Sequence, residues 1–129
     1  MNGKKAIKID VTNKTVTEVE IKNYTDIYNY IGNGCELFEC PVGWDNGDTL
    51  YVDEEALIKG QPKGCFMLKT KNYPVYLGNG IILGTDSEGD SITYKTNIDK
   101  IIDLIVWGDE VAAKQFKKER ISSPKVIIF

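Results

Sequence analysis

The side chains that most often move protons or attack bonds in enzymes are scarce in this sequence. Histidine, the commonest general acid or base, is absent from all 129 residues. The cysteines Cys35, Cys40 and Cys65 include no CxxC pair and have no histidine to act as their base. Their spacing also disfavours a structural zinc site. The sequence therefore predicts a protein that binds a ligand without catalysis and without a metal or cofactor.

The acidic side chains fall where acids occur for local reasons. Asp53, Glu54 and Glu55 open a predicted helical turn at 53–58, where the positive end of the helix dipole favours carboxylates. Three more acids lie in the polar turn 86–90. Both groups are expected to be solvated, so an enzyme that uses paired carboxylates is the minority interpretation.

Two glycine-containing loops flank one predicted strand and offer hydrogen-bond donors at its ends. Residues 78–80 precede the strand with the sequence Gly-Asn-Gly, and residues 84–91 follow it with the hydroxyls of Thr85, Ser87 and Ser91. Amides and hydroxyls of this kind suit a phosphate or a ribose. Neither loop matches a phosphate-binding fingerprint, and two tight turns that need glycine are the competing interpretation.

The stretch from Lys69 to Lys95 contains both aromatic and basic side chains. Rings beside polar loops can stack on a base, and lysines can neutralise a phosphate. The stretch therefore holds both kinds of group for one small anionic nucleotide. Half-buried packing is the alternative interpretation for each ring.

Predicted strands and helices must position these residues. Alternating apolar and polar residues predict a β-hairpin from 6–11 and 17–21. Further strands are expected at 35–42, 50–52, 65–68, 81–83 and 91–94. The segments 65–68 and 81–83 are apolar enough to be inner strands. The expected class is α+β, with an antiparallel β-sheet.

Three helices are predicted, at 25–31, 97–108 and 110–120. The second carries isoleucines at helical spacing and more of them than one core-facing stripe needs. In the third, Val111 and Phe116 are expected to point inward. The apolar segment 125–129 is expected either to complete the sheet or to pack on a neighbouring subunit. The surplus isoleucines and this segment predict a homo-oligomer.

Composition and sequence pattern limit the binding partners and the cellular location that we expect. The formal net charge of −3 disfavours a nucleic-acid binder that works by broad phosphate neutralisation. The longest nearly uninterrupted apolar run, 101–107, is broken by Asp103 and is too short for a membrane span. No secretory signal opens the chain. We therefore expect one cytoplasmic domain over residues 1–129, with no membrane partner.

The order of elements resembles a family of phage proteins. The resemblance spans residues 5–107 and is carried by AIKIDVTNKTVTEVEI, a short helix, GDTLYVDEEALIK, YPVYLGNGIILGTDSEGDS and an isoleucine-rich helix. These segments resemble the first-described family of phage Thoeris anti-defence proteins. The resemblance implies an antiparallel sheet with two or three helices packed on one face. It also implies a sponge that sequesters cyclic ADP-ribose isomers in an infected bacterium, so that Thoeris defence is blocked. A second site for cyclic oligonucleotides, and assembly of dimers into rings, are further implications.

The sequence departs from that family in its basic residues. The family contacts phosphates largely with basic side chains, arginine among them, whereas this sequence contains only one arginine. Lysines and loop amides would have to do more of the binding, or the arginine would have to come from a second subunit. The ligand-binding residues expected from local chemistry are Lys69, Lys71, Tyr76, Asn79, Thr85, Ser87, Ser91, Lys95 and Arg120. The alternative function is a small protein that inhibits a host protein by direct binding.

Overall fold

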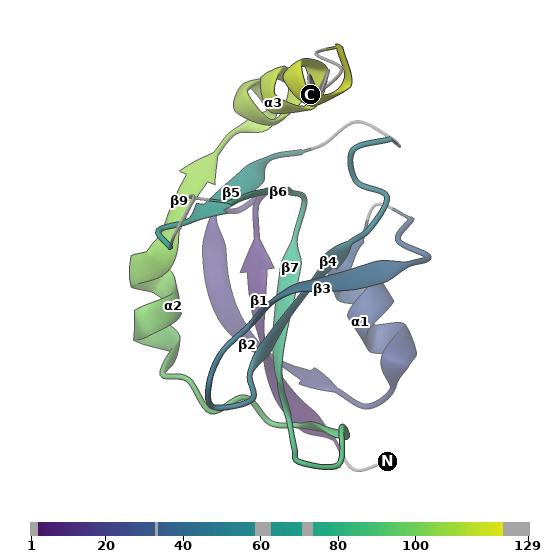
Figure 1. The fold of residues 1–129 in the computed structure, drawn as a ribbon, viewed down its shortest axis with the longest axis vertical. Helices are drawn as coiled ribbons and strands as arrows, with labels where there is room; N and C mark the ends of the chain where they lie inside the picture. Colours follow the sequence, from purple (N-terminus) through teal and green to yellow (C-terminus); the bar gives the residue numbers. More distant parts are fainter. Residues whose placement is uncertain (1–2, 33, 59–62, 71–73, 123–129) are drawn as a thin grey trace, which may run out of the picture.

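The computed structural model describes residues 3–32, 34–58, 63–70 and 74–122 (Figure 1). Strands and helices follow one another along these residues as β1 (Lys4–Asp10), β2 (Thr15–Ile21), α1 (Tyr24–Ile31), β3 (Phe38–Gly43), β4 (Thr49–Asp53), β5 (Cys65–Leu68), β6 (Val75–Leu77), β7 (Gly80–Thr85), β8 (Ser91–Ile92), α2 (Ile98–Leu104), β9 (Ile105–Gly108) and α3 (Glu110–Ser122). No helix in the described part of the chain is long and apolar enough to cross a membrane.

The strands form two antiparallel sheets. The large sheet has the order β2-β1-β7-β4-β3, and β8 pairs with the end of β7. The small sheet has the order β6-β5-β9. Ile81, Ile82 and Leu83 of β7 are all fully buried, because this central strand is covered on both faces. The predicted hairpin and the inner positions of β5 and β7 are confirmed.

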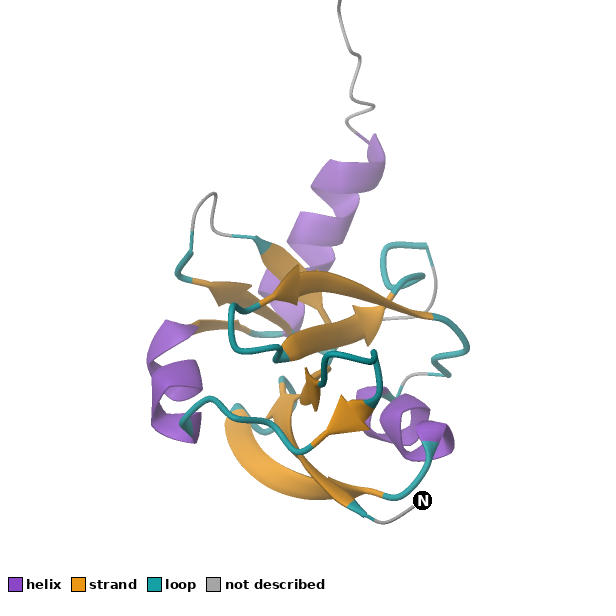
Figure 2. Cartoon of the chain, turned by 60° about the horizontal axis from the view of Figure 1, so that its bottom comes forward, coloured by secondary structure: helices purple, strands orange, loops and turns teal. Residues whose placement is uncertain are grey.

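Each face of the large sheet carries its own apolar layer. One layer joins the sheet to the small sheet and α2, and its buried members include Ile7, Ile82, Phe66 and Ile101. The other joins the opposite face to α1 through Ala6, Ile81, Leu83, Ile27 and Ile31. The α+β class is confirmed, and the helices lie on both faces rather than on one (Figure 2).

A buried carboxylate ties the β3–β4 turn to the segment that leads into α2. Asp48 is fully buried, and its two oxygens accept hydrogen bonds from the Lys95 N–H at 2.9 and 3.1 Å and from the Thr96 N–H at 2.7 Å. The preceding residue, Gly47, has φ of +94°, and a Cβ there would lie 2.5 Å from the Thr85 carbonyl oxygen. The turn therefore requires both the glycine and the carboxylate.

The helix predicted at 97–108 is wrong in its second half. It ends at Leu104, and Ile105–Gly108 form β9, which pairs with β5 from Leu68 to Cys65. Pairing with β5 satisfies the backbone hydrogen-bonding groups of Ile105–Gly108, and isoleucine, valine and tryptophan favour strands. These two effects outweigh the helical spacing of the isoleucines. Ile105 is buried in β9.

The third predicted helix is confirmed as α3, with the Asp109 carboxylate accepting a hydrogen bond from the Ala112 N–H at 2.8 Å. The prediction that Val111 points inward is wrong, because its side chain is 75% exposed. Ala113 is fully buried instead and packs with Phe116 on the outer side of the small sheet. The predicted strand or subunit contact of 125–129 lies outside the described residues.

Candidate ligand-binding site

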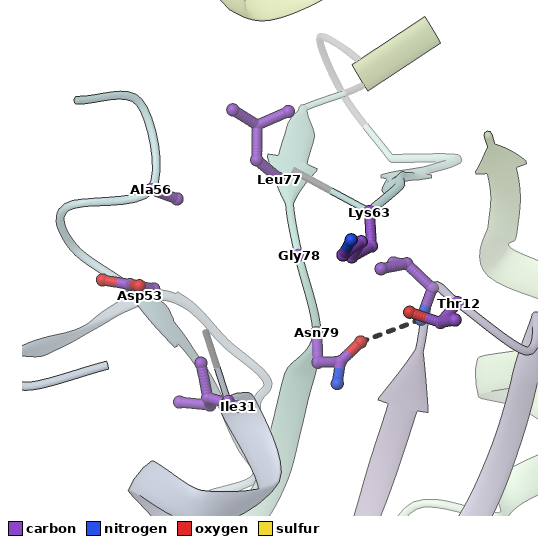
Figure 3. A pocket seen from close by; sticks show the side chains of 10 residues that line it. Thr12, Ile31, Asp53, Ala56, Lys63, Leu77, Gly78 and Asn79 are labelled. Atoms are coloured by element: carbon purple, nitrogen blue, oxygen red, sulfur yellow. Dashed lines mark hydrogen bonds between the residues drawn. The ribbon is translucent and has the colours of Figure 1, made fainter. Parts of the chain in front are cut away.

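Two adjoining cavities lie where β4 ends. The first has a volume of about 130 Å³ and is bordered by the ends of β1 and α1 (Figure 3). The second has a volume of about 330 Å³ and is bordered by β6 and α3. Asp53, Ala56 and Leu77 line both cavities. We call the two cavities together the β4 groove, a concave feature in the size range of small-molecule sites.

The first cavity has a rigid polar wall at Asn79. The side-chain oxygen of Asn79 accepts a hydrogen bond from the Val11 N–H at 2.9 Å, and its amide nitrogen donates to the Tyr30 carbonyl at 3.2 Å. These bonds join the end of β1 and the last turn of α1 to the residue that precedes β7. Because both ends of the amide are engaged, its orientation is fixed before any ligand arrives.

A basic and an acidic residue lie on opposite sides of this cavity. Figure 3 shows Lys63 and Thr12 on the side of Asn79, with Asp53 on the opposite side. Lys63 is exposed and is the only basic residue among the described residues that line the groove. Its neighbour Gly64 accepts a hydrogen bond from the Gly78 N–H at 3.0 Å, which fixes the backbone that carries the lysine.

The second cavity is rich in hydrogen-bond acceptors. The carboxylates of Glu39, Asp53 and Glu54 line it, together with the rings of Tyr76 and Phe116. Burial, and then the Glu39 carboxylate, raise the pKa of Tyr76 above its ordinary value, so its hydroxyl remains a donor at neutral pH. The Tyr76 ring packs on Phe66 with centroids 5.4 Å apart. This end of the groove therefore suits a ring that carries hydroxyl or amino groups.

Cys40 and Cys65 are not among the described residues that line the groove. Burial is the main cause that raises the pKa of the Cys65 thiol, and the same holds for Cys40, so neither is a ready nucleophile at neutral pH. Among the residues that the structure describes, no group of three histidine, cysteine, aspartate or glutamate side chains is placed to hold a metal ion. Fixed donors and acceptors are the chemistry that the site offers.

Two of the residues expected to bind a ligand line this groove. Asn79 lies in the first cavity and Tyr76 in the second. Neither Lys63 nor Thr12 was expected, and Asp53 was expected only as a capping residue. The fold brings Thr12, Asp53, Lys63 and Asn79 around one cavity. Because these residues are far apart in the sequence, no motif indicates that they form one site.

The other expected residues lie elsewhere. Thr85 faces Ser91 across the β7–β8 pairing, and Ser87 is exposed in the turn between them. The Lys95 side chain is exposed beyond this hairpin, while its N–H bonds to Asp48. The Lys69 N–H donates to the Leu104 carbonyl, at the opposite end of β5 from the groove. Arg120 belongs to α3, and Lys71 lies outside the described residues.

Comparison with known proteins gives one match. No curated protein and no solved structure matches the chain. A family model described as a domain of unknown function, DUF3846, matches residues 4–105. This range includes every residue that lines the first cavity, whereas α3 lies beyond it. The chain therefore belongs to the DUF3846 family.

Proposed function

We propose that this protein captures a small nucleotide in the β4 groove and holds it without cleaving it. The resemblance to phage Thoeris anti-defence proteins supports a cyclic ADP-ribose-type ligand and a role as a sponge in the cytoplasm of an infected bacterium. One observation carries the proposal: the groove has a lysine at one end and carboxylates beside aromatic rings at the other.

The two ends match the two parts of a nucleotide. Lys63, with the Thr12 hydroxyl beside it, offers charge-assisted contacts to a phosphate. Asp53 and Glu54 accept hydrogen bonds from ribose hydroxyls, a task that acidic residues perform in dinucleotide-binding folds. The Tyr76 ring provides a face for the base. The chain has no histidine, and burial raises the pKa of the Cys40 and Cys65 thiols, which supports binding without turnover.

Replacing Lys63 with alanine should weaken binding of the nucleotide by about ten- to a hundredfold, because one charge-assisted contact is lost. Calorimetric titration with a panel of cyclic ADP-ribose isomers measures the change. Lys69→Ala is the matched control, since Lys69 is an exposed lysine at the far end of β5. Unchanged affinity in Lys63→Ala, with a loss in Lys69→Ala, would move the site away from the groove.

A second candidate function is inhibition of a host protein by direct binding. Ile102, Val106 and Val111 are 46%, 40% and 75% exposed and follow one another through α2, β9 and α3. Exposed apolar side chains of this kind are typical of protein contacts. The same side chains support the proposal of a homo-oligomer. An inhibitor that acts by protein contact would capture no nucleotide, which separates the two functions in one experiment.

A further inference from the structure

A third hollow lies at the opposite end of β4 from the groove. It has a volume of about 570 Å³ and lies between the β3–β4 turn, which carries Trp44 and Asn46, and helix α2, which carries Lys100 and Asp103. Figure 1 shows this turn beside the segment that leads into α2. Among the described residues, none lines both the hollow and the groove.

The walls of this hollow are fixed by part-buried and exposed hydrogen bonds. The buried Asp48 carboxylate holds the backbone of Lys95 and Thr96, as described above. The Asn46 side-chain nitrogen donates to the Thr96 hydroxyl at 2.9 Å. Within the turn itself, the Trp44 N–H donates to the Asp48 carbonyl at 2.8 Å. The position of Trp44 relative to α2 is therefore set in the free protein, which reduces the entropic cost of binding.

The hollow is lined by one indole ring and several polar side chains. Trp44 is half-buried and packs against the main apolar core on one side, so its ring is held in place. Asp45 and Asp103 are exposed carboxylates, and Asn46 and Lys100 add donors. The two carboxylates outnumber the single ammonium among the described residues that line the hollow, which disfavours a phosphate.

We propose that this hollow binds a neutral sugar ring. One face of a pyranose presents C–H groups that pack on an indole, and its rim presents hydroxyls. These hydroxyls donate to the carboxylates of Asp45 and Asp103 and accept from Asn46 and Lys100. An open site lined by one aromatic ring and short polar side chains provides few contacts, so the expected affinity is weak, with Kd of about 1 mM.

The test follows the indole N–H resonances of the intact protein by NMR. The chain has two tryptophans, so Trp44→Phe assigns the Trp44 signal, and Trp107 serves as an internal control. Glucose, galactose, mannose and N-acetylglucosamine are titrated to about 10 mM, above the expected Kd. At least one sugar should shift the Trp44 signal saturably and leave the Trp107 signal in place.

Asp103→Asn provides the second variant. Asp103 is exposed, so its replacement should leave the fold intact. This variant should weaken the sugar affinity at least about fivefold, since a charged acceptor becomes a neutral one. The proposal is overturned if no sugar shifts the Trp44 signal, or if both tryptophans shift together. It is also overturned if AMP shifts the Trp44 signal and the sugars do not.

Discussion

Replacing Asp48 with alanine should lower the free energy of unfolding by about 3–5 kcal/mol. The carboxylate is fully buried and accepts hydrogen bonds from the backbone N–H groups of Lys95 and Thr96. Alanine leaves both donors without this acceptor and removes the link between the β3–β4 turn and the segment before α2. Urea unfolding followed by circular dichroism measures the change.

Two further variants define the cause of that loss. Asp45→Ala removes an exposed carboxylate from the same turn and should change stability by less than about 0.5 kcal/mol. Asp48→Asn keeps one acceptor oxygen, so its stability should fall between those of the parent and Asp48→Ala. If Asp48→Ala unfolds at the same urea concentration as the parent, the carboxylate is not the link that the structure indicates.

Replacing Ala56 with tryptophan should reduce nucleotide affinity by at least about a hundredfold, a change of about 3 kcal/mol. Ala56 lines both cavities of the β4 groove, so a large side chain at this position takes up space that the ligand needs. Because Ala56 is half-buried, the indole can enter the groove without displacing a fully buried residue. The affinity is measured by calorimetric titration with the same cyclic ADP-ribose isomers.

Val111→Trp is the matched control for this variant. Val111 is 75% exposed on α3 and lines neither cavity, so an added indole there leaves the groove open. Both variants should unfold at urea concentrations close to that of the parent. Parent-like binding by a folded Ala56→Trp protein would place the ligand outside the β4 groove.

The parts of the fold that the sequence predicts are those set by local pattern. The alternation in 6–11 and 17–21 predicts the hairpin that β1 and β2 form, and the apolar run at 81–83 predicts an inner strand. Local pattern fails at Ile105–Gly108, where isoleucine spacing fits a helix while the unpaired edge of β5 favours a strand. The decisive partner lies about 40 residues earlier in the chain, and local spacing contains no information about it.

The site was less predictable than the fold for the same reason. Asn79 was expected to contact a ligand. Its side-chain amide also forms hydrogen bonds with the backbone of Val11 and Tyr30, which are 68 and 49 residues away in the sequence. Asp48 lies in a turn, and its partner Lys95 is 47 residues away. Lys63 occupies a loop with no recognisable motif. Each of these roles depends on tertiary contacts that residue spacing does not encode.

Release of the captured ligand tests the proposed function most directly. The protein is incubated with a panel of cyclic ADP-ribose isomers, separated from unbound nucleotide and denatured by heat, and the supernatant is analysed by chromatography. The account predicts that at least one isomer is returned chemically unchanged, in an amount proportional to the protein, and that Ala56→Trp returns much less of it. Failure to retain any isomer, or accumulation of a linear nucleotide with time, would contradict capture without cleavage.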